Sequence, residues 1–196
     1  MAKLYYRYGA VGSAKTLNLL AVAHNYRQQG KEVLLVKPSL DDRFGRAHIK
    51  SRAGLEKSAD ILVDKDTDLL SCNFEGISCI LVDEAQFITA NIIEQFRDIT
   101  LLYNIPVICY GLRTDFKRHL FEGSLRLLEL ADSIEEIKTT CAFCNRKAVY
   151  NLKHSNGIET TDGPTIDLGA EEKYLPACAC CYSEQLLIPL CKNQKS

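Results

Sequence analysis

A run of eight residues near the start of the chain has the residue types and spacing of a phosphate-binding loop. The run matches G-x-x-x-x-G-K-[ST] at every place but one, and reads Gly9, Ala10, Val11, Gly12, Ser13, Ala14, Lys15 and Thr16. In such a loop, backbone N–H groups and the first turn of a helix hold phosphate oxygens. We expect Lys15 to contact the β- and γ-phosphates of ATP and the Thr16 hydroxyl to ligate Mg²⁺. The alternative is an ordinary strand-to-helix turn that contains Lys-Thr by chance.

Ala14 is the one departure from this pattern, because it stands where a glycine normally precedes the lysine. A methyl group here crowds the phosphates or strains the backbone. Gly12 is the residue expected to supply the missing conformational freedom.

Asp83 and Glu84 follow directly after the apolar run Cys79–Val82. Open α/β sheets bind ligands at the carboxyl ends of their strands. Two carboxylates here resemble a Walker B site, in which Asp83 holds the magnesium shell and Glu84 accepts a proton from a hydroxyl nucleophile. The alternative is a charged turn at the end of a strand.

Two further classes of protein compete with a small-molecule phosphotransferase. The segment Asp83–Gln86 is also similar to the second motif of nucleic-acid helicases, which makes a nucleic-acid-dependent ATPase with a zinc ribbon the second hypothesis. A helicase motor normally needs two such cores, and the balanced charge of this chain offers no track for a polyanion. The third hypothesis is a zinc-ribbon binding module whose phosphate loop is vestigial.

Two C-x-x-C pairs near the end of the chain predict a structural zinc site, with Cys141, Cys144, Cys178 and Cys181 as ligands. Four thiolates leave no open position on the ion. The 33 residues between the pairs predict two knuckles joined by an extended hairpin rather than a helix. Cys180 is an alternative ligand to Cys181, but it would leave only one residue between itself and Cys178. A redox dithiol is the alternative for either pair alone.

Apolar runs and helical periodicity predict the elements that position these residues. We expect strands at Lys3–Tyr8, Val33–Val36, Ile61–Val63, Cys79–Val82, Val107–Tyr110 and Ile134–Lys138. We expect helices at Lys15–Gln29, Thr89–Tyr103 with Thr89 as N-cap, and Gly123–Ala131, and a polar loop at Pro38–Gly54. Alternation of apolar strands with helices implies a parallel sheet covered on both faces. After Thr140 the sequence has paired cysteines and turn residues and little helical periodicity. The expected domains are therefore 1–139, an α/β kinase domain, and 140–196, a zinc ribbon.

Composition narrows the class of partner. The 24 Lys and Arg residues nearly balance the 25 Asp and Glu residues, which argues against nucleic acid as a partner. No apolar run approaches the length of a membrane span and no cleavable leader is recognised, so we expect a soluble cytoplasmic protein without a membrane partner. Of the nine cysteines, Cys72, Cys79, Cys109 and Cys191 lie singly and are expected to act as small buried hydrophobes.

Taken together, the motifs resemble the thymidine kinase family of the bacterial and vertebrate cytosolic type, over nearly the whole chain. The resemblance rests on Gly9–Thr16, Lys37–Pro38 with Asp41–Phe44, Asp83–Phe87, Tyr110–Phe116 and both cysteine pairs. It implies a P-loop (RecA-like) α/β fold and transfer of the γ-phosphate of ATP to the 5′-hydroxyl of thymidine, and also of deoxyuridine. It further implies Mg²⁺, a structural Zn²⁺, a homotetramer, and feedback inhibition by thymidine triphosphate.

The resemblance also implies roles for individual residues. Glu84 is the general base, and Lys15 and Arg43 act with it on the transferred phosphate. Asp41 and Arg43 meet the triphosphate and the metal, and Asp83 and Gln86 belong to the nucleotide site.

On the acceptor side, the resemblance implies that Phe116 packs against the thymine ring and that Phe87 forms a second apolar wall. Either phenylalanine is otherwise ordinary core. A lid held by the zinc domain covers the base, and its expected residues are Thr165, Ile166, Asp167, Leu168, Gly169 and Tyr174.

Overall fold

A six-stranded parallel sheet forms the centre of the protein. The computed structural model describes residues 1–41, 47–155, 158–161, 163 and 174–187. The sheet has the order β5-β2-β6-β7-β1-β8, and every neighbouring pair in it is parallel. Its strands are β1 (Leu4–Tyr8), β2 (Glu32–Pro38), β5 (Ile61–Val63), β6 (Ile77–Val82), β7 (Val107–Gly111) and β8 (Ser133–Glu136).

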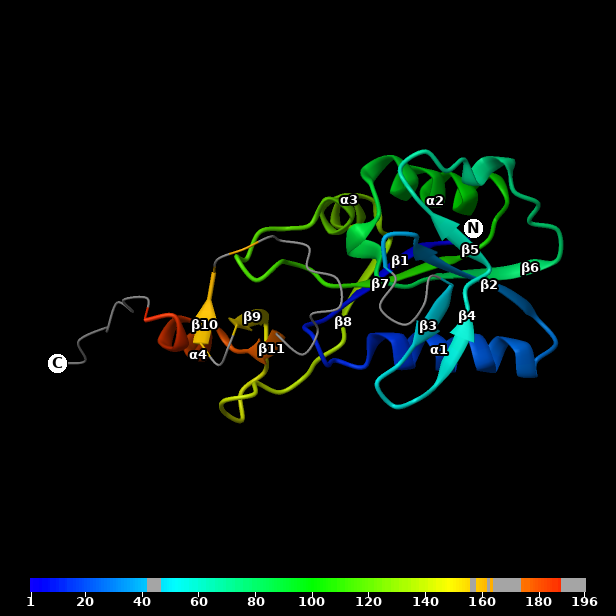
Figure 1. The fold of residues 1–196 in the computed structure, drawn as a ribbon. Coiled ribbons are helices and arrows are strands. Elements are labelled where there is room, and N and C mark those ends of the chain that lie inside the picture. Colours follow the sequence, from blue (N-terminus) through cyan, green and yellow to red (C-terminus); the bar gives the residue numbers. More distant parts are fainter. Residues whose placement is uncertain (42–46, 156–157, 162, 164–173, 188–196) are drawn as a thin grey trace.

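Helices cover both faces of this sheet, as Figure 1 shows. Helix α1 (Lys15–Gln28) lies on one face, and α2 (Ala90–Leu102) and α3 (Glu122–Leu130) lie on the other. One apolar cluster joins α1 to the sheet through Leu19, Leu35 and Leu81, and a second joins α2 through Phe96 and its neighbours. The predicted α/β fold is therefore confirmed, and each predicted strand and helix lies within two residues of its observed bounds.

The start of α2 is capped differently from the expectation. Thr89 does occupy the N-cap position, but its hydroxyl makes no capping hydrogen bond and its Oγ1 is buried without a hydrogen-bond partner. The backbone N–H of Ala90 donates instead to Oε1 of Glu122, at 2.8 Å. A carboxylate at this end also complements the helix dipole. The sequence could not reveal this cap, because Glu122 comes from the following helix.

The predicted polar loop at Pro38–Gly54 was wrong in its second half. Strand β3 (His48–Lys50) forms there and pairs antiparallel with β4 (Glu56–Ser58), which follows the predicted loop and was not predicted either. Only Ile49 of β3 is buried, so the segment has too little apolar pattern to predict a strand. Two short 3₁₀ helices, η1 (Leu69–Ser71) and η2 (Ala85–Phe87), complete this part of the chain.

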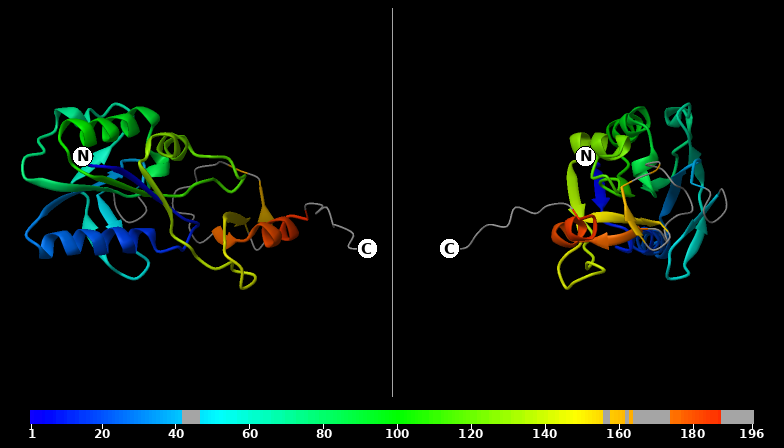
Figure 2. Two further views of the ribbon diagram at one scale, coloured as in Figure 1. Left: turned by 180° about the vertical axis from the view of Figure 1, so that it is seen from behind. Right: turned by 60° about the vertical axis from the view of Figure 1, so that its left-hand side comes forward.

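The C-terminal part of the chain forms a separate small sheet, which projects from the end of the larger one in Figure 1 and in the left view of Figure 2. Strand β9 (Tyr150–Ser155) pairs antiparallel with β10 (Ile158–Thr160) and with β11 (Tyr174–Ala177). The extended hairpin expected between the cysteine pairs is confirmed. Helix α4 (Ala179–Gln185) was not predicted. Within the described residues, no helix has the length and apolar character needed to cross a membrane.

Candidate active site and metal centre

A pocket of about 260 Å³ lies at the carboxyl edge of the parallel sheet. Its wall combines the phosphate loop, the acidic end of β6, the β3–β4 hairpin and one residue of the C-terminal sheet. The lining residues are Val11–Leu17, Asp41, His48–Ala53, Asp83, Glu84, Gln86, Phe87, Leu112 and Tyr174.

The phosphate loop holds a left-handed backbone at two places. Gly12 has φ +76° and Ala14 has φ +61°. Glycine adopts this conformation freely, whereas a residue with a β-carbon does so at a cost. The position that departs from the sequence pattern is therefore the one that needs a glycine-like backbone.

Lys15 begins α1 and is largely buried. Its ammonium group donates to the carbonyl oxygens of Gly9 (3.1 Å) and Ala10 (3.0 Å) and to Oγ of Ser13 (3.3 Å). Gly9 and Ala10, which were also predicted to bind the nucleotide, are not among the residues that line the pocket. The loop thus holds the lysine at the edge of the space where phosphates would lie.

Thr16 and Asp83 come together from two different elements. The Thr16 hydroxyl donates to the Asp83 carboxylate, with Oγ1 lying 3.2 Å from Oδ1 and 3.1 Å from Oδ2. A hydroxyl at the start of a P-loop helix and a carboxylate at the end of a strand are oxygen donors of the kind that Mg²⁺ favours. The side chains present therefore fit this ion.

Glu84 has an unusual backbone as well as a suitable carboxylate. Its φ is +50°, a left-handed conformation in which glutamate is strained. Nε2 of Gln86 donates to Oε2 of Glu84 at 2.5 Å, and Oε1 of Gln86 accepts from the backbone N–H of Leu112 at 2.9 Å. A β-carbon at Gly111 would lie 2.7 Å from Gln86 Oε1, so the glycine makes room for this contact. The turn therefore aims Glu84 into the pocket.

A buried ion pair stands beside the phosphate loop. Nζ of Lys37 lies 3.1 Å from Oδ2 of Asp41, and both side chains are at least 95% buried. The same ammonium group donates to the His48 carbonyl oxygen at 2.9 Å. Asp41 and His48 flank Arg43, which lies outside the described residues.

The residues expected to hold the base are brought together only in part. Phe87 lines the pocket and stacks edge-on against Phe121. Phe116 is buried and does not line the pocket. Its ring centroid lies 6.1 Å from that of Tyr174, and Tyr174 does line the pocket. The expected lid at 165–169 lies outside the described residues.

Asn151 was not among the residues predicted from the sequence. It is buried on β9, its Oδ1 accepts from the Val11 backbone N–H, and its Nδ2 donates to the Thr114 carbonyl oxygen. No motif surrounds Asn151, so only the fold reveals that the C-terminal sheet contacts the phosphate loop.

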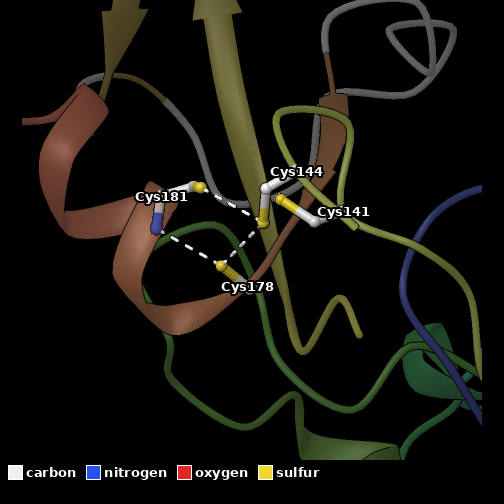
Figure 3. Close-up of side chains that lie close together, drawn as sticks. All are labelled: Cys141, Cys144, Cys178 and Cys181. Carbon is white, nitrogen blue, oxygen red and sulfur yellow. Dashed lines mark hydrogen bonds between the residues drawn. The ribbon is translucent and has the colours of Figure 1, made fainter. Parts of the chain in front are cut away.

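Four cysteine sulfurs gather at the base of the C-terminal sheet, as Figure 3 shows. Within the described residues, the sulfurs of Cys141, Cys144, Cys178 and Cys181 all lie within 4.8 Å of one another. Cys144 Sγ is 3.7 Å from Cys178 Sγ and 3.6 Å from Cys181 Sγ. Thiolates bound tetrahedrally to one zinc ion are separated by about 3.8 Å. The cluster therefore fits zinc, and the preference for Cys181 over Cys180 agrees with it.

The electrostatics of the cluster also favour a cation. Burial raises the pKa of the Cys141 thiol, but hydrogen bonds from neighbouring backbone N–H groups lower it to about 7. Burial and hydrogen bonds with the other sulfurs raise the pKa of Cys181. One thiolate is thus readily formed, whereas several together need a positive ion. Cys180 Sγ instead contacts Oε1 of Glu184, at 3.3 Å.

The single cysteines agree in part with the expectation of buried hydrophobes. Cys79 and Cys109 are fully buried in the sheet, and burial raises the pKa of both thiols. Cys72 is half-buried, and Cys191 lies outside the described residues.

Comparison with solved structures gives only weak likenesses. The chain is similar to the Pif1 helicase of Candida albicans with a TM-score of 0.40 and 12% identity, over 69% of this chain and 36% of that one. This likeness carries no argument about function.

Comparison with protein families and curated sequences is far more specific. The family model described as thymidine kinase matches residues 2–182. The chain is 43% identical to a thymidine kinase of Streptococcus gordonii over 181 residues, which span 91% of this chain and 94% of the relative. It is 42% identical to a thymidine kinase of Chromobacterium violaceum over 183 residues, 93% of this chain and 98% of the relative. The chain therefore belongs to the thymidine kinase family of ATP-dependent kinases.

Proposed function

We propose that this chain transfers the γ-phosphate of ATP to the 5′-hydroxyl of thymidine, and also of deoxyuridine, through the residues of the pocket described above. The observation that carries these assignments is the meeting of Thr16, Asp83 and Glu84 in one pocket with the phosphate loop. Such a pocket combines a site for a triphosphate with a base for a hydroxyl group.

The donor half of the reaction is assigned to the phosphate loop and its neighbours. Backbone N–H groups of Gly12 and of Ala14–Thr16 hold the phosphates, and Lys15 turns from the loop carbonyls to the β- and γ-phosphates. Thr16 and Asp83 hold Mg²⁺, which when bound neutralises charge on the triphosphate. Asp41, Arg43 and Gln86 complete the nucleotide site.

We assign the role of general base to Glu84. Its carboxylate accepts the proton of the 5′-hydroxyl as that oxygen attacks the γ-phosphorus, and the bond from the γ-phosphorus to the β,γ-bridging oxygen breaks to release ADP. Arg43 offsets the charge on the phosphoryl group during transfer. The contact from Gln86 and the strained turn support this role, because both hold the carboxylate in one place.

The acceptor half is assigned to Phe87, Phe116, Tyr174 and the lid at 165–169. Phe87 and Tyr174 line the pocket directly, whereas Phe116 contributes by packing behind Tyr174. We assign the kinase domain to 1–139 and the lid-bearing zinc ribbon to 140–196. The four-cysteine cluster supports a structural zinc ion that anchors the strands leading to the lid.

Two properties of the proposal concern the whole enzyme. We propose that the enzyme is a homotetramer. We also propose that thymidine triphosphate inhibits it, because this molecule contains both a thymidine group and a triphosphate and so matches both halves of the pocket. Light scattering tests the first, and rate measurements with added thymidine triphosphate test the second.

A nucleoside panel tests the function. The protein is incubated with ATP, Mg²⁺ and each of thymidine, deoxyuridine, deoxycytidine, deoxyadenosine and deoxyguanosine. Thymidine monophosphate is the expected principal product, and omission of Mg²⁺ should abolish its formation. ATP hydrolysis that appears only when DNA or RNA is added would contradict the proposal.

A further inference from the structure

The β3–β4 hairpin forms one wall of the donor pocket and is fixed to the same helix as the phosphate loop. Ile49, on β3, is 1% exposed and packs in the apolar cluster that contains Leu19 and Leu20 of α1. Helix α1 also carries Lys15 and Thr16 at its start. One helix therefore fixes the position of the hairpin relative to the phosphate loop.

The turn of this hairpin has a defined backbone. Oγ of Ser51 accepts from the Leu55 backbone N–H at 3.1 Å, and the Ser51 backbone N–H donates to the Leu55 carbonyl oxygen at 2.8 Å. The Gly54 N–H donates to the Ser51 carbonyl oxygen at 3.0 Å, and Gly54 has φ +87°, which glycine adopts without strain. Buried Ser51 thus organises a turn that carries Arg52 at a set position.

Arg52 reaches from this turn to the phosphate loop. Its Nη1 lies 3.9 Å from the place that a β-carbon on Gly12 would occupy. Both residues line the pocket, and the Arg52 side chain is exposed there rather than packed in the core. One nitrogen of the guanidinium group therefore lies next to Gly12 of the phosphate loop.

The carboxylates that line the pocket would repel the phosphates of ATP, and a cation near them reduces this repulsion. Asp41, Asp83 and Glu84 all line the pocket, and bound ATP adds several further negative charges. Among the described lining residues, the lysines and arginines are Lys15, Lys50 and Arg52. A guanidinium group presents several N–H donors in a fork that matches phosphate oxygens.

We propose that Arg52 contacts the phosphates of ATP directly and, with Lys15, neutralises the charge of the triphosphate. The inference rests on the proposed function, because it assumes that the pocket takes ATP. It extends the donor site beyond the phosphate loop to a hairpin that no motif marks.

The experiment compares Arg52→Gln and Arg52→Lys with the wild-type protein. Arg27→Gln is the matched control, because Arg27 is an exposed arginine near the far end of α1 and outside the pocket wall. For each protein, calorimetry gives the Kd of ATP with Mg²⁺, and steady-state rates give kcat and the KM of ATP and of thymidine.

Arg52→Gln is expected to lower kcat/KM for ATP about 10²-fold and to weaken ATP binding, with the KM of thymidine within twofold of wild type. Arg52→Lys should lose less, because it keeps the charge but not the fork. Wild-type values of ATP Kd and kcat/KM in Arg52→Gln would overturn the inference, as would an effect confined to the KM of thymidine. Failure of the proposed function shows separately, as a wild-type protein that forms no thymidine monophosphate, and the ATP Kd still tests Arg52 in that case.

Discussion

The side-chain oxygen of Asn151 accepts a hydrogen bond from the backbone N–H of Val11 at 2.8 Å, across 140 residues of sequence. The amide group of Asn151 also donates to the carbonyl oxygen of Thr114 at 3.2 Å. One buried side chain therefore joins three parts of the protein: the C-terminal sheet, the phosphate loop and the segment after β7. The zinc-bearing part of the chain is thus attached directly to the backbone that would hold phosphate.

Asn151→Ala should cost about 1–3 kcal/mol of unfolding free energy, because it leaves the buried N–H of Val11 and the carbonyl of Thr114 without partners. It should also raise the KM of ATP, since the phosphate loop loses a fixed contact. Urea denaturation and initial rates measure the two effects. Asn73→Ala is the control, because the side chain of Asn73 bonds only locally and on the surface. Unchanged stability in Asn151→Ala would contradict the role of this contact.

Ala14→Gly should stabilise the protein by about 0.5–1 kcal/mol, because glycine removes the strain of a β-carbon at φ +61°. The same substitution at Ala21, in the exposed middle of α1, should have the opposite sign and cost up to about 1 kcal/mol. Thermal denaturation of both variants gives the comparison. A destabilised Ala14→Gly protein would mean that the methyl group is held by favourable packing.

Glu84→Gln should retain ATP binding and lose about 10²- to 10⁴-fold in kcat, because an amide cannot accept the hydroxyl proton. Glu75→Gln serves as control, since Glu75 is exposed and is not among the residues that line the pocket. ATP binding is measured by calorimetry and kcat by formation of thymidine monophosphate. Near-normal turnover would remove Glu84 from the role of base.

Lys37→Met should destabilise the protein by about 3–5 kcal/mol, because it takes the ammonium group of Lys37 away from the buried carboxylate of Asp41. The double variant Lys37→Met/Asp41→Asn should recover part of this loss, since it also removes the buried negative charge of Asp41. Urea denaturation of the wild type, both single variants and the double variant forms a complete cycle. Additive effects in that cycle would show that the pair does not act as a unit.

The α/β core was predictable because its signals are local. Apolar runs such as Cys79–Val82 mark buried parallel strands, and the phosphate loop sits between a strand and a helix as its pattern requires. The ligand set of the metal centre was predictable for the same reason, since two short cysteine spacings define it.

The remainder depends on contacts between distant segments. Asn151, the cap that Glu122 gives to α2 and the position of Arg52 over Gly12 all join residues that no local pattern connects. Helix α4 was missed because it is only seven residues long and begins within the second cysteine pair. Its first turn is stabilised by the Cys178 sulfur, which accepts from the Cys181 backbone N–H at 3.4 Å. Short elements of this kind depend on tertiary contacts rather than on periodicity.

Removal of zinc should weaken thymidine binding more than ATP binding. The cysteine cluster fixes the ends of β11 and α4, and β11 carries Tyr174 into the pocket. The Tyr182 hydroxyl of α4 also donates to the carbonyl oxygen of Phe116. Loss of the ion therefore loosens Tyr174 and the contact with Phe116 directly, whereas it reaches the phosphate loop indirectly, through Asn151, and Asp83 follows β6 of the parallel sheet. A chelator at neutral pH and the variant Cys144→Ser both test this, with Kd measured separately for thymidine and for ATP.

Cys72→Ser is the control for the cysteine variant, because Cys72 is half-buried and lies outside the cluster. It should keep both affinities and the zinc content of the wild type. Lower pH should reproduce the effect of chelation, since protons compete with the ion for the sulfurs as the pH falls. Zinc content and thymidine affinity should then fall together. Equal loss of thymidine and ATP binding in Cys144→Ser would instead indicate general unfolding, and retention of both would mean that the zinc site does not support the acceptor side.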